Sequence, residues 1–337
     1  SDTSIDALIL AASASVGVSA GTGVGVSLGA SVAINEIGKS EPFSIKAYLE
    51  DSGVNAGGAM NVSATSTQSI KATVAAISAA VTVSAGTGVG ASGSGVYATN
   101  DINADIAAYF KGSGASGIEA RSITFTASDD SSIKAFAGAA SLAVALSGGT
   151  GVTISLAGAL ASNIIDTSVM AGIEDASSGV TTTNGDLIIT STQSGTIEAE
   201  AYAASLAAAL SGGTGIAVSG AGALAQNEII GGVEALIDSS DVTSTGGVSL
   251  SASNTSLIDA TIAAIALSAS LSGGTGVGVG IGLSMARNYI GGTASGGGSA
   301  LDVIASINNS DVEAAQAISL SAISDQEINA FVAAAAM

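Results

Sequence analysis

The tripeptide Gly-Thr-Gly occurs five times along the chain at nearly equal intervals, and this repetition constrains the fold more than any other feature. The copies begin at Gly21, Gly86, Gly149, Gly213 and Gly274. The period is therefore about 64 residues, within the range of repeat architectures. A fixed period is the signature of a repeat array in which each unit packs on its neighbours. We therefore expect residues 1–337 to form one continuous array.

Two further markers keep a fixed distance from each tripeptide: an Asn follows it at one constant spacing, and an Ile precedes it at another. The asparagines are Asn35, Asn100, Asn163, Asn227 and Asn288. The isoleucines open units of approximately 5–69, 70–132, 133–196, 197–257 and 258–327, and Ile328 opens a truncated sixth unit, 328–337. Length varies only after each Asn, so the fixed block is predicted to be packed core and the variable part to contain surface turns.

Each unit contains a long run without charged residues, and the side chains in it alternate in size. The runs cover 7–35, 72–100, 135–165, 201–227 and 260–286. After Gly276, one set of alternate residues is Val277, Val279, Ile281, Leu283 and Met285, and the other is Gly278, Gly280, Gly282, Ser284 and Ala286. A period of two is typical of strands, whereas a helix would mix the two sets around its circumference. We therefore predict an all-β chain.

Two architectures fit this pattern. In the favoured one the chain winds as a β-solenoid-like stack, with each unit forming three rungs of about 20 residues. In the alternative, Gly-Thr-Gly is the tip of a long β-hairpin, its glycine adopts a positive φ, and successive hairpins stack.

The composition argues against several classes of function. The chain has 27 acidic and 7 basic residues and a formal charge of −20, which disfavours binding to nucleic acid or to anionic membranes. It has no His and no Cys, so the usual general bases and thiol nucleophiles are missing, and we predict that it is not an enzyme. Five Tyr and five Phe are too few for the aromatic girdles of a membrane β-barrel, so we expect no membrane insertion.

Acidic residues recur at predicted turns, at Asp51, Asp175, Asp238, Asp241 and Asp311. If the units stack, these carboxylates can form ladders in which like charges repel. Ca²⁺, which prefers oxygen ligands, would relieve this repulsion. The known Gly-Gly-x-Gly-x-Asp calcium repeat is absent, so solvated surface acid is the favoured interpretation and weak calcium sites are the alternative. We expect no other cofactor.

The repeated asparagines belong to the set of small residues, where we predict an internal ladder of stacked amides. The same Ala, Gly and Ser side chains form a flat surface that a second sheet can approach closely, either within one subunit or between subunits. The interrupted sixth unit and the uncapped ends of a solenoid also favour self-association, end to end or lateral.

The unit Ile-x-Ala…Ser-Gly-Gly-Thr-Gly-Val…Ala-x-Asn-x-Ile, followed by Val-Glu-Ala-Leu-Ile-Asp-Ser-Ser-Asp-Val and Gly-Gly-Val-Ser-Leu-Ser-Ala, resembles repeats of very large bacterial surface proteins. These are the filamentous-haemagglutinin-like adhesins and related β-strand-repeat proteins. The resemblance spans the whole chain and implies secretion, a long β-solenoid shaft, and a role in adhesion or in an extracellular matrix.

Together these features predict a structural shaft or self-assembling filament of a bacterial cell-surface adhesin or of an extracellular matrix such as that of a biofilm. The alternative is an adhesive module that recognises a glycan or a host protein, in a calcium-dependent form if the acidic turns bind the ion; the sequence names no receptor. Glycan sites usually present aromatic platforms, and the scarcity of aromatic residues argues against that alternative.

Overall fold

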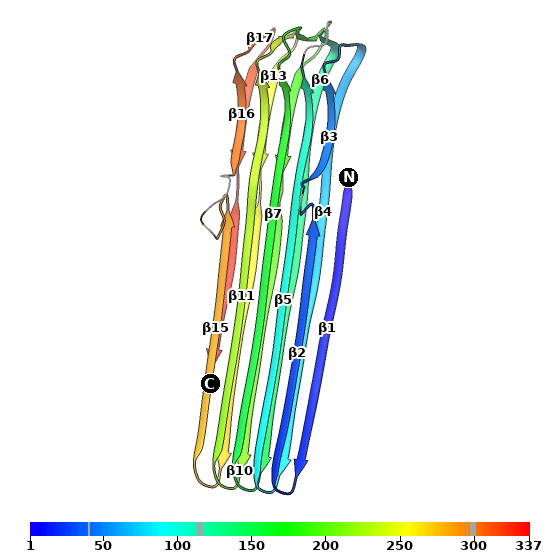
Figure 1. Ribbon diagram of the computed structural model, residues 1–337. Coiled ribbons are helices and arrows are strands. Elements are labelled where there is room, and N and C mark those ends of the chain that lie inside the picture. The colour runs from blue at the N-terminus through cyan, green and yellow to red at the C-terminus, as the bar shows by residue number, and fades with distance from the viewer. Residues whose placement is uncertain (40, 113–116, 295, 297–300) are drawn as a thin grey trace.

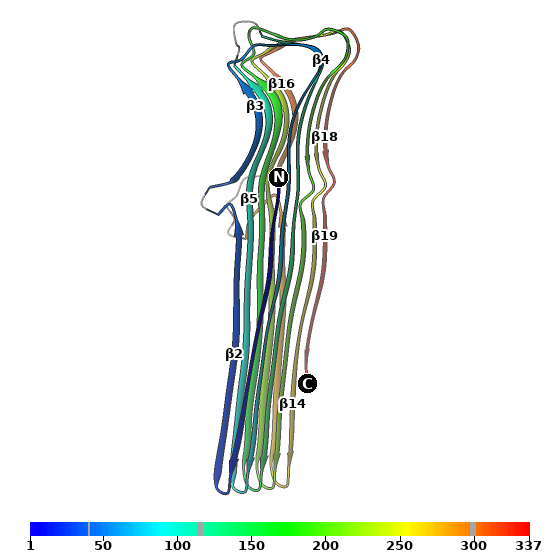
Figure 2. The same cartoon turned by 90° about the vertical axis from the view of Figure 1, so that its right-hand side faces the viewer.

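The chain forms two long, parallel β-sheets that lie face to face (Figures 1 and 2). The computed structural model describes residues 1–39, 41–112, 117–294, 296 and 301–337. Within these residues it contains nineteen strands and no helix, so the prediction of an all-β solenoid-like stack is confirmed. We call the 12-stranded sheet "sheet A" and the 7-stranded sheet "sheet B".

The strands of sheet A are β1 (Asp2–Ser19), β4 (Val54–Ser84), β6 (Ile118–Ser147), β8 (Val180–Thr182), β9 (Leu187–Gln193), β10 (Thr196–Ser211), β12 (Asp241–Ser244), β13 (Val248–Asn254), β14 (Leu257–Ser272), β17 (Asp311–Ala314), β18 (Ile318–Ser324) and β19 (Glu327–Ala336). The strands of sheet B are β2 (Thr22–Ile37), β3 (Phe43–Glu50), β5 (Thr87–Lys111), β7 (Gly151–Glu174), β11 (Gly215–Asp238), β15 (Gly276–Ile290) and β16 (Asp302–Asn308).

One sequence unit makes one coil of the solenoid. The chain runs down sheet A, crosses at a Gly-Thr-Gly turn, returns up sheet B, and crosses back at the opposite end (Figure 1). Each strand therefore pairs in parallel with the strand one unit further along. The isoleucine markers form a single column through sheet A, in the order Ile5, Ile70, Ile133, Ile197, Ile258 and Ile328.

This register corrects the expected coil size. Three rungs of about 20 residues were predicted for each unit, but β4 and β6 alone contain 31 and 30 residues. Two such long passes, one in each sheet, complete the coil. The hairpin alternative is wrong in its pairing. The arms β1 and β2 belong to different sheets, so the Gly-Thr-Gly turn is an arch between sheets.

The first glycines of the five Gly-Thr-Gly turns do not have the positive φ that the hairpin alternative predicted. Their role is close stacking of successive arches. A Cβ atom on Gly86 would lie 2.7 Å from the carbonyl oxygen of Gly21, and one on Gly148 would lie 2.2 Å from that of Ala85. At Gly86 and Gly148 the backbone of the preceding arch therefore leaves no room for a Cβ atom, although the first two arches carry Ala20 and Ala85 at the position of Gly148.

The interior between the sheets changes along the strands. Near the arches it is filled by Ala, Gly and Ser, because only two residues separate β1 from β2 and so short a connection holds the sheets close together. Further along, a core of Ile, Val and Ala follows, and near the opposite end the core contains larger side chains such as Phe110 and Phe125. We call the two ends the arch half and the corner half.

Candidate functional surfaces

The predicted small-residue face lies inside the molecule, where the two sheets meet. Hydroxyl groups connect the sheets there: Ser13 and Ser27 Oγ are 2.8 Å apart, and Ser141 and Ser155 Oγ are 2.9 Å apart. Ser205 Oγ also donates across the sheets to the Ser155 carbonyl at 2.7 Å. The close approach of these small side chains therefore occurs within one subunit, and they are not available for contacts between subunits.

The five repeated asparagines form a continuous column in sheet B. The first four, from Asn35 to Asn227, each donate Nδ2–H to Oδ1 of the asparagine in the next coil at 2.7 to 2.8 Å, and Asn288 accepts the last of these bonds. Asn100, Asn163 and Asn227 are fully buried. Because each inner amide both donates and accepts a hydrogen bond, the column satisfies buried polar groups along the stack and links each coil to the next.

A second buried polar group lies between the Ile/Ala core and the larger core of the corner half. Asp129 is 1% exposed, and Ser131 Oγ donates to its Oδ1 at 2.8 Å. The neighbouring coil places Gln193 beside it, and Asn254 Nδ2 donates to Gln193 Oε1 at 2.6 Å. Burial raises the pKa of the Asp129 carboxyl above its usual range, although nearby hydroxyl groups oppose the shift.

The outward face of the arch half is apolar on both sheets. The Val, Leu and Ile side chains that alternate with the small residues point away from the interior. In the inner strands Ile77 is 56% exposed and Leu156 is 54% exposed; in the outermost strand Val18 reaches 77%. The five charge-free runs stack in this half, so the exposed apolar surface is continuous across the coils.

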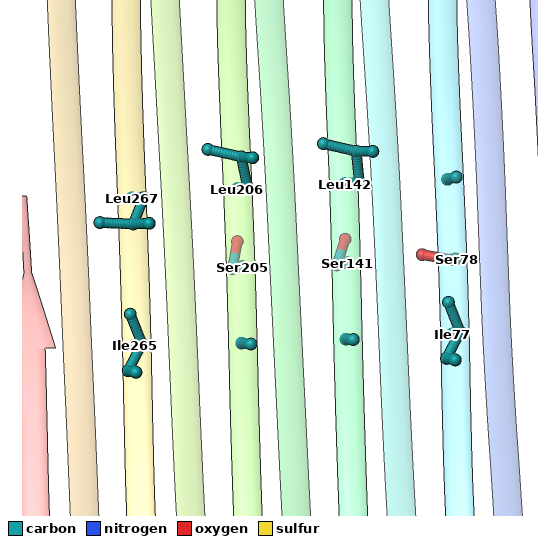
Figure 3. A pocket seen from close by; sticks show the side chains of 11 residues that line it. Ile77, Ser78, Ser141, Leu142, Ser205, Leu206, Ile265 and Leu267 are labelled. Carbon is teal, nitrogen blue, oxygen red and sulfur yellow. The ribbon is translucent and has the colours of Figure 1, made fainter.

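Sheet A carries a shallow apolar hollow on this outer surface (Figure 3). Its floor is formed by Ala140 and Ala204, which lie in adjacent strands. Ile77 and Ile265 close it at two opposite ends, and Leu142 and Leu206 border it on the side nearer the arches. Phe136 and Tyr202 border it on the other side, with ring centroids 5.8 Å apart.

Several charged side chains form ion pairs between neighbouring coils. Lys111 Nζ is 2.8 Å from a Glu174 carboxylate oxygen, and Lys134 Nζ is 2.9 Å from one of Glu198. These pairs are largely exposed, so each contributes little to stability. They oppose the like-charge repulsion that a column of acids alone would create.

The structure distributes the predicted calcium residues along the corners. Asp51 and Asp175 follow the ends of their strands in left-handed conformations, with φ of 46° and 54°. Asp238 is the last residue of β11, and Asp241 and Asp311 lie side by side in adjacent coils. In the described part of the chain, no group of three or more acidic, His or Cys side chains is arranged to hold a metal ion.

Comparison of the chain with protein-family models, with curated proteins and with solved structures found no match. Among the residues that the structure describes, no helix is long and apolar enough to cross a membrane.

Proposed function

We propose that the chain is a non-enzymatic structural shaft of a bacterial cell-surface adhesin or extracellular matrix, and that it lengthens by strand pairing at its ends. The observation that carries this proposal is the continuous parallel ladder in which every coil repeats the register of the one before. The resemblance to haemagglutinin-like repeats supports an extracellular or cell-surface location.

The end coils keep the geometry that pairing requires. Within the described residues, the backbone of β1 pairs only with β4 and that of β2 only with β5, so one edge of each strand is open. At the other end of the stack, β15 and β19 each likewise present an open edge. An open edge pairs readily with another strand. A further coil, from the same chain or from a second copy, can therefore continue both ladders.

The hydrogen-bond pattern identifies positions at which a proline substitution would block this growth. Ser19 O accepts from Ala85 N at 3.2 Å, and Gly21 O accepts from Thr87 N at 3.1 Å, so odd-numbered residues of β1 and β2 point their amides toward the stack. The N–H groups of successive residues in a strand alternate in direction, so those of the even-numbered residues Ala12 and Ala30 point away from the stack, along its open edge. Proline at these two positions removes an edge donor and leaves the existing ladder intact.

Electron microscopy over a range of concentrations tests the proposal. We expect rods that lengthen along the stack with concentration, and we expect the A12P/A30P variant to remain short at every concentration. Particles of one stack length at all concentrations, or A12P/A30P rods as long as those of the parent, would contradict growth through these edges.

A further inference from the structure

The outer face of sheet A has a pattern of side-chain sizes that is complementary to itself. The row Ser78, Ser141 and Ser205 points inward and divides this face into two sides (Figure 3). Two outward residues of one strand that lie at equal distances on either side of the row are called a pair. In the three central strands β4, β6 and β10, the pairs one and three residues from the row each join a large residue to a small one. The pairs are Ile77 with Ala79 and Val81 with Ala75 in β4, Leu142 with Ala140 and Val144 with Gly138 in β6, and Leu206 with Ala204 and Tyr202 with Ala208 in β10.

From this pattern we propose that a second copy of the chain packs on the outer face of sheet A, related by a twofold axis that runs along the serine row. Such an axis reverses the strand direction and places each residue opposite its pair mate in the same strand of the partner. Leu142 and Leu206 of one copy then enter the hollow above Ala140 and Ala204 of the other, and the reverse contact is identical. A twofold interface must be self-complementary in this way.

The size of the face agrees with a stable dimer. The apolar face around the serine row extends over five strands spaced about 4.8 Å apart and about 11 residues of about 3.3 Å each, or roughly 850 Å² per copy. The pairs of a large with a small residue occupy its three central strands, whereas the flanking strands place Leu10 opposite Val16 and Ile265 opposite Leu267. Specific protein interfaces bury about 800 Å² on each partner. The outermost pairs lie at the level of Phe136 and Glu200, and the Lys134–Glu198 ion pair lies just beyond them. The outermost level of the contact therefore already contains one charged residue, Glu200, opposite Leu210.

Charge also favours the antiparallel arrangement. The formal charge of −20 resides outside the charge-free runs, so two copies packed in the same direction would bring their corner halves side by side. The proposed axis overlaps only the arch halves and points the charged halves in opposite directions, which reduces like-charge repulsion. The stack direction is unchanged by the axis, so two growing shafts can stay paired along their length.

This lateral pairing goes beyond the proposed shaft and uses the outer face of sheet A, whereas strand addition is proposed at the open edges of β1, β2, β15 and β19. Sedimentation velocity and light scattering of the full chain carrying A12P/A30P separate the two processes, because Ala12 lies on this face only in the flanking strand β1, outside the three central strands. We expect this edge-blocked protein to be a dimer. A monomer at every concentration would overturn the lateral proposal without bearing on growth at the edges.

Exchanging large and small residues across the axis gives the sharpest test. In the edge-blocked protein, Ala140→Leu places the introduced leucine of one copy against Leu142 of the other, and we expect the dimer dissociation constant to rise at least about tenfold. The A140L/L142A variant exchanges the two sizes and restores one large and one small residue in the pair, so we expect the dimer to return. Equal weakening by both variants, or no weakening by A140L, would contradict the twofold arrangement.

A matched pair of charge substitutions identifies the face. Leu206→Asp on sheet A should dissociate the dimer, whereas Leu156→Asp, on the equally apolar outer face of sheet B, should leave it unchanged. Circular dichroism of both variants checks that the fold is kept. Dissociation by L156D alone would assign the dimer to sheet B. Flotation of the edge-blocked protein as a monomer with neutral phosphatidylcholine vesicles would show that lipid covers the face. Either result would overturn the proposal.

Discussion

Asp129 brings a carboxyl group into the interior, at a level where the other coils carry neutral polar residues. Its neighbours in the column are Ser66 and Gln193, followed by Asn254. Burial disfavours the charged form of a carboxyl group and raises the pKa of Asp129. Asp129 therefore stays protonated to a higher pH than a solvent-exposed aspartate does.

Replacing Asp129 with Asn should stabilise the protein at neutral pH. Because the folded-state pKa is raised, the folded state binds the proton more tightly, and this contribution to stability is complete below the unfolded-state pKa and lost as pH rises through the folded-state pKa. We expect D129N to raise the free energy of unfolding at pH 7 by about 1 kcal/mol, the scale of one buried polar group without full compensation. Urea denaturation at several pH values measures the difference.

The difference between D129N and the parent should shrink as the pH falls through the raised folded-state pKa of Asp129, and it should level off near pH 4, where the unfolded aspartate is protonated too. Asp130→Asn is the matched control, since Asp130 is the adjacent and exposed carboxylate. A D129N variant that is less stable than the parent at pH 7, or an effect equal to that of D130N, would show that the Asp129 charge is compensated in the folded state.

The asparagine column could be predicted from the sequence, because the same residue type recurs at the same distance from the tripeptide in all five units. The polar layer around Asp129 was not predictable in the same way. Its column changes type from Ser66 to Asp129 to Gln193, and no repeated letter marks it. Only the register between coils shows that these residues are neighbours.

At the scale of the element, the arch is the feature that determines how the coils stack. Gly148 lies where any Cβ atom would collide with the neighbouring arch, whereas Gly158 lies in the middle of β7 with no atom within 4 Å of the equivalent position. Both are glycines of the same unit, but backbone contact constrains only the first.

We expect Gly148→Ala to destabilise the protein and Gly158→Ala to be neutral or stabilising. The first change forces backbone atoms of stacked arches apart, at a cost of about 1–3 kcal/mol, typical of overpacking. The second removes conformational freedom from the unfolded chain, which is worth about 0.4–1 kcal/mol. Thermal or urea denaturation of the two variants compares them directly. Equal losses would mean that the arches do not stack as closely as the structure shows.

The alternation of strand residues could be predicted from the sequence, but the direction of each face could not. A period of two defines two faces and leaves open which one is buried. Hydrophobicity alone favours placing Val277, Ile281 and Leu283 inside. The short arch reverses this choice, because sheets held so close together admit only small side chains, and the larger ones remain outside at 43%, 63% and 62% exposure.

At the scale of the whole molecule, the sequence predicts a stack of equal units but not the number of passes in each. Repeat length is compatible with three short rungs or with one long coil. The distinction depends on strand length and on a turn between sheets, and neither leaves a residue signature beyond Gly-Thr-Gly. One long coil per unit makes a flat blade with two broad faces, one of which forms the proposed dimer contact.

The distance between spin labels at Val18 and Leu271 tests the single-coil architecture most directly. The chain has no native cysteine, and both positions are exposed, so a V18C/L271C variant can be labelled cleanly and diluted with unlabelled protein. Val18 pairs in turn with Val83, Leu146, Leu210 and Leu271, so the labels are four coils apart. At the spacing of neighbouring strands, pulsed electron paramagnetic resonance should give a distance of about 19 Å. A distance of about 58 Å, as three rungs per unit would give at the same spacing, would contradict the architecture and the apolar faces derived from it.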